Sequence, residues 1–245
     1  MNLIEARVVL QERGLYRIRT DRGEQNALVS GKFHYDALSA SDYPVVGDFV
    51  LADCTDPQTA VIHRVLPRKS LFVRRAAGTG QAEQAVAANV DTVFLCMSLN
   101  NDFSLRRLER YLAVAWESGA QPVVVLTKAD LCGDVAQKQL EVESVAVGVP
   151  ILAVSSTAED GYAQILPYVT AGRTVAFVGS SGVGKSTLIN RLLGGGAPGH
   201  GRPAKRRQGP PHHDPPGVAA AAKRRDGHRH AGHARAGHVG RSLGR

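Results

Sequence analysis

The sequence lacks the features of a membrane or secreted protein. No run of residues approaches the ~18 consecutive apolar positions that a membrane-spanning helix needs, and the opening residues MNLIEARVVLQERG reach charged side chains before they build an apolar core. The three cysteines, Cys54, Cys96 and Cys132, lie far apart, with no cysteine or histidine at zinc-ligand spacing. We therefore expect a soluble cytoplasmic protein that has reduced thiols and does not associate with a membrane.

Acidic, aromatic and large apolar residues are scarce at the C-terminal end. Of the 245 residues, 43% are apolar, which is enough for the core of one or two domains. The formal net charge of +8 comes from residues 194–245, which hold 11 Lys or Arg and 2 Asp or Glu, so the rest of the chain is close to neutral. This segment has no aromatic residue, and its only large aliphatic residues are Val218, Val239 and Leu243. Such a composition cannot offset the entropy lost on ordering, so we predict a disordered basic tail over 194–245.

Short strands separated by turns are predicted for the first 75 residues. Apolar and polar residues alternate at 5–10 and 16–20, and further strands are predicted at 49–52 and 60–65. This spacing indicates a small barrel. Residues 67–75 follow it and contain Arg68, Lys69, Arg74 and Arg75. They are either a solvated linker or a contact with an RNA backbone.

From residue 90 the pattern changes to alternating strands and helices. Continuous apolar runs at 91–98, 122–126, 150–154 and 174–178 are typical of strands buried in a parallel sheet. Ser104 and Asp134 are suitable N-caps for helices that follow the first two of these strands, and 161–169 is helix-like. We predict an α/β region, with Trp116 in the core of its first helix.

A phosphate-binding loop follows the fourth strand. Residues 179–186 read GSSGVGKS and match G-x-x-x-x-G-K-[ST], with the helix predicted at 187–193 directly after. Its glycines let backbone N–H groups turn toward an anion, and the helix N-terminus adds its dipole. The predicted catalytic residues are Lys185, which would reach the β- and γ-phosphates, and Ser186, which would also ligate Mg²⁺. The predicted phosphate-binding residues are Gly179, Ser180, Ser181, Gly182, Val183, Gly184, Lys185, Ser186 and Thr187.

A second motif, at the end of an earlier strand, points to the base. Thr127, Lys128, Ala129 and Asp130 resemble the [N/T]-K-x-D motif of GTPases, in which the Asp carboxylate accepts two hydrogen bonds from guanine that adenine cannot supply. Lys128 would lie across the ring. Thr127 stands where Asn is commoner and cannot make the same amide contacts, which predicts weaker base binding. Ser155 and Ser156, in 154–157, resemble the further loop that touches guanine through backbone amides.

The order of the motifs carries the resemblance. An ordinary GTPase has its phosphate loop first, whereas here the base motif comes first, so the domain is circularly permuted. Together with the barrel and the segments at 43–48, 65–68, 87–91 and 107–111, this arrangement resembles the RsgA family over residues 1–193. The resemblance implies an all-β OB-fold barrel at 1–75 and a partial, permuted P-loop GTPase domain at 76–193. It also implies GTP/GDP and Mg²⁺ as ligands and a monomer that binds the small (30S) ribosomal subunit and its rRNA. The implied activity is GTP hydrolysis coupled to late maturation of that subunit.

The resemblance ends after residue 193. The family continues with a switch segment like GRHTTT, a DTPG loop and a zinc domain, and none of them is in the sequence, so the zinc expected for the family has no ligands here. We interpret the histidines at 212–213 and 228–238 as incidental. With suitably chosen codons, residues 207–214 read one nucleotide later give GKGRHTT, and 228–234 give IDTPGM. We hypothesise that the chain is frameshifted from about Gly194, by a sequencing error or a lesion in the gene.

Two other functions stay open from the sequence. Without the later strands, 174–178 would be an unprotected sheet edge, and the switch residues would be missing. The chain would then be a nucleotide- or RNA-binding remnant without turnover. A P-loop ATPase of another kind is the third possibility, which guanine selectivity at Asp130 would exclude.

Overall fold

The computed structural model describes residues 2–12, 14–75, 83–100, 102–158, 160–193, 219–222 and 237–238. These residues divide into two compact units. The first extends to Asp91 and also includes Val114–Gln121, and the second holds Thr92–Ala113 and the described residues from Pro122 onward. The domain boundaries at 75 and 193 stay predictions.

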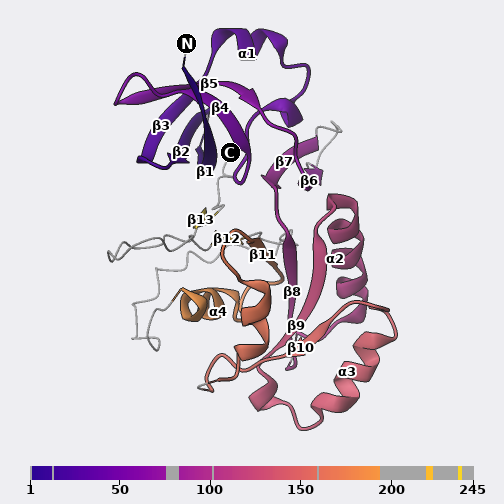
Figure 1. The fold of residues 1–245 in the computed structure, drawn as a ribbon. Coiled ribbons are helices and arrows are strands. Elements are labelled where there is room, and N and C mark those ends of the chain that lie inside the picture. The colour runs from indigo at the N-terminus through magenta and orange to yellow at the C-terminus, as the bar shows by residue number, and fades with distance from the viewer. Residues whose placement is uncertain are drawn as a thin grey trace, which may run out of the picture. The chain divides into compact units, whose positions relative to one another are not determined.

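The first unit contains a closed five-stranded barrel, as predicted. Its strands are β1 (Leu3–Glu12), β2 (Leu15–Thr20), β3 (Gly23–Val29), β4 (Phe49–Asp53) and β5 (Thr59–Val65), in the order β1-β2-β3-β5-β4 (Figure 1). Alternate side chains such as Val8, Ile18 and Ile62 fill the interior. Strand β3 was missed by the sequence analysis because Glu24, Gln25 and Asn26 obscure its alternation. The helix α1 (Gly31–Asp36) and the 3₁₀ turn η1 (Ala40–Asp42) follow β3.

Arg68 has a structural role that neither interpretation of 67–75 included. Its guanidinium donates to both carboxylate oxygens of the fully buried Asp48, at 2.8 and 2.7 Å, and to the carbonyl oxygens of Ser41 and Tyr43. Asp48 also accepts from the backbone N–H of Val45 at 2.8 Å. Arg68 therefore fixes the segment that leads into β4, while Lys69 remains exposed. The chain then forms a hairpin of β6 (Leu71–Arg75) and β7 (Glu83–Ala88).

The second unit is built on a sheet with the order β10-β9-β8-β11-β12-β13. Its first four strands are β8 (Thr92–Ser98), β9 (Gln121–Thr127), β10 (Ile151–Ala153) and β11 (Thr174–Val178). β10 pairs with β9, and β11 pairs with β8, in parallel. Every residue of β8 and β11 is buried. The predicted α/β region with a parallel sheet is confirmed.

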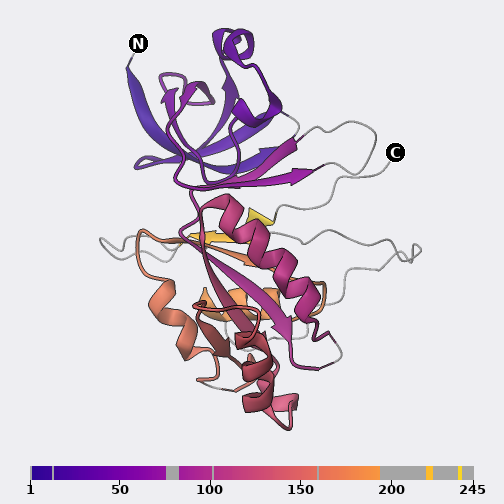
Figure 2. The same ribbon diagram turned by 90° about the vertical axis from the view of Figure 1, so that its right-hand side faces the viewer.

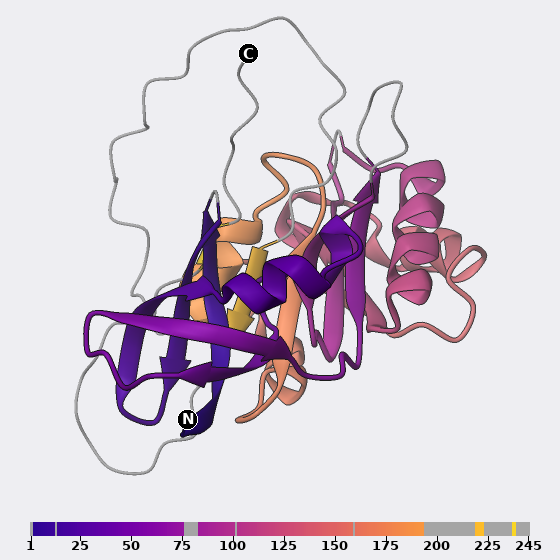
Figure 3. The ribbon, with the colours of Figure 1, turned by 90° about the horizontal axis from the view of Figure 1, so that it is seen from above.

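Helices cover both faces of this sheet. They are α2 (Leu105–Ser118), α3 (Val135–Glu143), α4 (Lys185–Leu192) and the 3₁₀ turns η2 (Ala129–Leu131) and η3 (Ala163–Tyr168). α2 and α3 lie on one face, which Figure 2 presents to the viewer, and α4 lies on the other (Figures 1 and 3). Phe94, Phe177, Leu188 and Ile189 form the core beneath α4.

Trp116 does not lie in the core, so that prediction was wrong. The buried stripe of α2 runs through Leu108, Leu112 and Ala115, and the next helical position turns away from it. The Trp116 side chain is 55% exposed.

Two short strands from residues 194–245 extend the sheet. β12 (Ala219–Ala222) pairs antiparallel with β11, and β13 (Gly237–His238) pairs with β12. The expectation that β11 forms an open edge is corrected, because β11 is hydrogen-bonded on both sides. The expectation of disorder throughout the tail does not hold for these six residues, whose backbones satisfy the donors and acceptors of the neighbouring strand. Apart from them, the predicted tail lies outside the described residues.

Candidate nucleotide-binding site

The predicted phosphate loop leaves β11 between two positions that only glycine suits. At Gly179 the backbone has φ +156°, and an added Cβ would lie 2.4 Å from the carbonyl oxygen of Cys96 in β8. At Gly184 φ is +99°, and this residue is the N-cap of α4. The loop thus returns to the helix in a conformation that side chains rarely adopt, and the first backbone N–H groups of α4 have no intrahelical acceptor.

Lys185 is folded over this loop. Its Nζ donates to the carbonyl oxygens of Gly179 and Ser180, at 2.7 and 2.6 Å. Burial lowers the pKa of Lys185 below the ordinary lysine value. Carbonyl oxygens are weaker partners for an ammonium than phosphate oxygens are, so a phosphate within reach of this amino group would compete with them. Ser186 is exposed and Thr187 half-buried in the first turn of α4.

The predicted base motif is tied to the phosphate loop. Thr127, buried at the end of β9, donates its hydroxyl to the carbonyl oxygen of Val183 at 2.6 Å. Lys128 follows with φ +58°, a left-handed conformation that starts the turn η2. The backbone N–H of Ala129 donates to Val154 at 3.1 Å. Thr127 therefore has a hydrogen-bonding role of its own, which the sequence analysis, comparing it with Asn, did not find.

Asp130 lies at the surface of the turn and meets the third predicted segment. Hydrogen bonds with the hydroxyls of Ser155 and Thr157 hold the pKa of the Asp130 carboxyl below its ordinary value. Those two hydroxyls also lie 2.8 Å from each other. The carboxylate is thus ionised and able to accept hydrogen bonds at neutral pH.

A tight turn holds the third segment in shape. The backbone N–H of Ser155 donates to Gly161 at 2.9 Å, and a Cβ on Gly161 would lie 2.3 Å from the carbonyl oxygen of Ser155. Ser156 points toward the phosphate loop, with its Oγ 4.0 Å from the position of a Cβ on Gly184. The structure therefore brings together the three segments that the sequence analysis selected.

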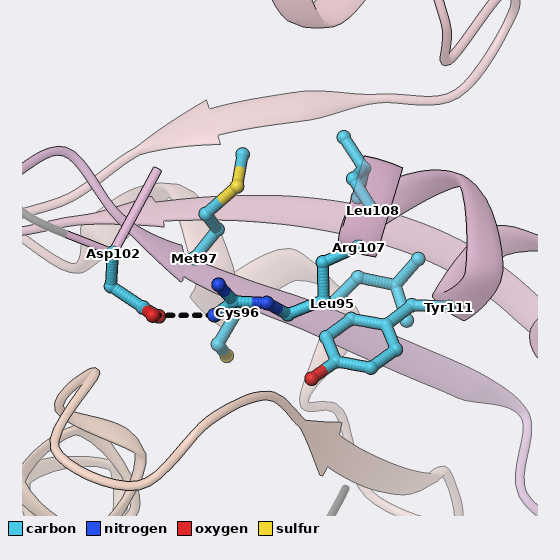
Figure 4. A pocket seen from close by; sticks show the side chains of 7 residues that line it. All are labelled: Leu95, Cys96, Met97, Asp102, Arg107, Leu108 and Tyr111. Atoms are coloured by element: carbon cyan, nitrogen blue, oxygen red, sulfur yellow. Dashed lines mark hydrogen bonds and ion pairs between the residues drawn. The ribbon is translucent and has the colours of Figure 1, made fainter. Parts of the chain in front are cut away.

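One residue that contacts the phosphate loop was missed. Arg107 of α2 donates to the Ser180 hydroxyl. It also forms an ion pair with Asp102 (Figure 4). The segment 107–111 entered the sequence analysis only as part of the family resemblance. No local pattern pointed to the contact with Ser180, because Arg107 lies next to the apolar stripe of α2, where a charged residue is usually solvated. Arg107 and Asp102 also line a small pocket, whose remaining lining residues are Leu95, Cys96, Met97, Leu108 and Tyr111.

Neither a metal cluster nor a membrane helix is found in the described part of the chain. No group of three or more His, Cys, Asp and Glu side chains is placed to hold a metal ion there. Of the histidines at 212–213 and 228–238, only the backbone of His238 is among the described residues. No described helix is long and apolar enough to cross a membrane.

Comparison with known proteins decides the family. The sequence model described as RsgA GTPase matches residues 65–199. The chain belongs to the RsgA GTPase family. A small ribosomal subunit biogenesis GTPase RsgA 2 from Lactiplantibacillus plantarum is 51% identical over 191 residues, which are 78% of this chain and 54% of the relative. An RsgA from Opitutus terrae is 45% identical over 79% of this chain and 55% of the relative.

Solved structures support the same fold. YjeQ from Thermotoga maritima superposes with a TM-score of 0.64 and 27% identity, over 78% of this chain and 65% of that one. YloQ, a circularly permuted GTPase, gives a TM-score of 0.59 over 77% of this chain and 64% of that one; at 24% identity this likeness concerns the fold alone. The predicted barrel followed by a permuted RsgA-type α/β region is confirmed. The chain spans about half the length of the curated relatives it matches.

Proposed function

We propose that this chain binds GTP and GDP, and that the protein encoded by the restored reading frame hydrolyses GTP during late maturation of the small ribosomal subunit. The observation that carries the proposal is the hydrogen bond from Thr127 to Val183, because it joins the base motif to the phosphate loop. Membership of the RsgA GTPase family supports GTP hydrolysis as the reaction. The chain would act as a cytoplasmic monomer with the small ribosomal subunit and its rRNA as partners. The names of its relatives support the subunit as a partner.

Each segment of the site has a distinct task in this proposal. Asp130 accepts hydrogen bonds from guanine, Lys128 covers the ring, and the turn of Ser155 and Ser156 presents backbone groups to the base. The loop from Gly179 to Thr187 holds the phosphates through its N–H groups, and Lys185 neutralises their charge. The half of the site that these residues build suits a nucleotide with a phosphate chain.

Mg²⁺ would bind beside the phosphates. Among the described residues, the Ser186 hydroxyl is the predicted ligand, since it stands in the first turn of α4 next to Lys185. The ion would neutralise charge on the phosphate oxygens. The protein's own contribution to the rate would be electrostatic, from Lys185 and the fixed N–H groups, and a single such contact is typically worth about 10²–10³-fold.

Nucleotide binding without turnover is the second candidate. Two observations favour it. β12, a run of four alanines, occupies the sheet position beside β11, and the sequence contains neither the GRHTTT-like nor the DTPG segment. Guanine binding is the same in both candidates, so only turnover separates them.

The decisive experiment compares this chain with one in which a single-nucleotide edit near codon 195 restores the other reading frame. GTP turnover is measured with and without small ribosomal subunits. We expect little turnover from the chain as printed and subunit-stimulated turnover from the edited one. Full stimulated hydrolysis by the printed chain would show that the frameshift hypothesis is wrong.

A further inference from the structure

Arg191, in the last turn of α4, makes contacts that the proposed function does not use. Its Nη1 donates to the carbonyl oxygen of Ala158 at 2.7 Å, and Nη2 donates to that of Thr157 at 3.4 Å. The guanidinium also lies over the ring of Tyr162, 5.6 Å from its centroid. One side chain of the phosphate-loop helix therefore holds the turn that begins at Ser155.

This contact reaches Asp130 in two steps. Arg191 holds the carbonyl of Thr157, and the Thr157 hydroxyl lies 2.8 Å from that of Ser155. The hydroxyl of Ser155, and to a smaller extent that of Thr157, lowers the pKa of the Asp130 carboxyl. The turn is therefore fixed from the Asp130 side and from α4. Since α4 begins at Lys185, the same helix carries the phosphate contact at its start and this clamp at its end.

The simplest alternative is that Arg191 only stabilises its own helix, since a cation in the last turn interacts favourably with the helix dipole. A positive charge alone would be enough for that. The observed geometry is more specific, because the planar guanidinium spans two consecutive carbonyl oxygens, which an ammonium group cannot reproduce. In addition, the Nε of Arg191 is buried without a partner, an arrangement that helix stability by itself does not favour.

We propose that Arg191 is a positioning residue for base recognition, which fixes the turn at Ser155–Ala158 relative to α4. The inference rests on the proposed guanine site. It goes further by making base selectivity depend on a side chain that does not touch the nucleotide. Loosening the turn weakens the contacts of Ser155, Ser156 and Asp130 with guanine and leaves the phosphate contacts of Lys185 intact.

The test measures dissociation constants for fluorescent GDP and, by competition, for ADP and inorganic pyrophosphate. Arg191→Ala should weaken GDP binding about tenfold, the equivalent of one charge-assisted hydrogen bond, with pyrophosphate binding unchanged. Arg191→Lys keeps the positive charge at the end of the helix but loses the planar guanidinium that spans two carbonyl oxygens. Its dissociation constant for GDP should therefore be closer to that of Arg191→Ala than to that of the parent. Arg106→Ala, at an exposed position of α2, is the matched control and should bind all three ligands like the parent.

A double-mutant cycle with Asp130→Ala completes the test. If Arg191 acts through the turn that holds Asp130, its replacement should have little further effect on GDP binding once Asp130 is removed. Additive losses, or an equal loss of GDP and pyrophosphate binding in Arg191→Ala, would overturn the inference. A measurement on the unmutated chain tests the proposed guanine site separately from the role of Arg191. Equal binding of GDP and ADP by that chain would refute the guanine site itself. Circular dichroism of Arg191→Lys checks that the fold is retained.

Discussion

Gly179→Ala is the most direct test of the close packing under the phosphate loop. The new Cβ would lie 2.4 Å from the carbonyl oxygen of Cys96, at a residue with φ +156°. Backbone strain of this kind costs about 1–3 kcal/mol, and forcing an extra carbon against a packed strand costs about 1–3 kcal/mol more. Because the Cys96 carbonyl belongs to the backbone of the buried strand β8, no flexible side chain can move to relieve the contact. We expect a total loss of about 3 kcal/mol or more.

Thermal unfolding followed by circular dichroism measures this loss. For a chain of this length each kcal/mol lowers Tm by about 2–4 °C, so Gly179→Ala should lower it by at least about 6 °C. Gly182→Ala is the matched control, because Gly182 has φ +83° but nothing within 4 Å of an added Cβ. Gly182→Ala should be destabilised only by the new backbone strain, which lowers the free energy of unfolding by about 1 kcal/mol. Gly133→Ala, with open space and no positive φ, should be neutral.

The comparison among these glycine variants tests whether the packing of Gly179 against Cys96 contributes to stability. Equal shifts for Gly179→Ala and Gly182→Ala would mean that the approach of the loop to Cys96 contributes nothing. A Gly179→Ala variant as stable as the parent would refute the packing argument altogether.

Three further predictions concern other positions. Asp130→Ala should remove most of the preference for GDP over ADP, since a site built for a hydrogen-bond pattern can reject the wrong base by up to ~10⁴-fold; equal preference in parent and variant would contradict the assignment. Lys185→Ala should abolish binding of fluorescent GDP without lowering Tm, and in the parent the affinity should fall as the pH rises toward the lowered pKa of Lys185, where the cation is lost. Arg68→Ala should lower the free energy of unfolding by about 3–5 kcal/mol, because it leaves Asp48 buried and charged without its partner; urea denaturation would measure this, and a loss below that of an exposed ion pair would refute it.

Local sequence patterns predicted the elements that are buried on both faces. Strand β11 was placed at its observed bounds, and the N-caps Ser104 and Asp134 mark the starts of α2 and α3, because continuous apolar runs and capping side chains are local signals. The permuted order of the two nucleotide motifs could also be predicted, because recognising it requires only the positions of short motifs in the sequence.

Contacts between distant segments were not predictable in this way. The partner of Arg68 is twenty residues upstream, and Ser180 is 73 residues downstream of Arg107, so neither contact appears as a periodicity. Thr127 was judged by comparison with Asn, and only the structure shows the carbonyl of Val183 as its acceptor. The exposure of Trp116 has a similar cause: the width of a helix's buried stripe depends on what packs against it.

The position of Cys96 beneath Gly179 has a chemical consequence. Full burial raises the pKa of the Cys96 thiol to about 12, so it carries almost no thiolate at neutral pH and resists alkylation. Cys54 and Cys132 are partly exposed. A maleimide dye would therefore attach to these two sites alone, and after Cys54→Ser to Cys132, which directly follows the turn η2 that carries Asp130. The wild-type arrangement of thiols thus allows a fluorescent reporter beside the proposed base site without disturbing the strand below the phosphate loop.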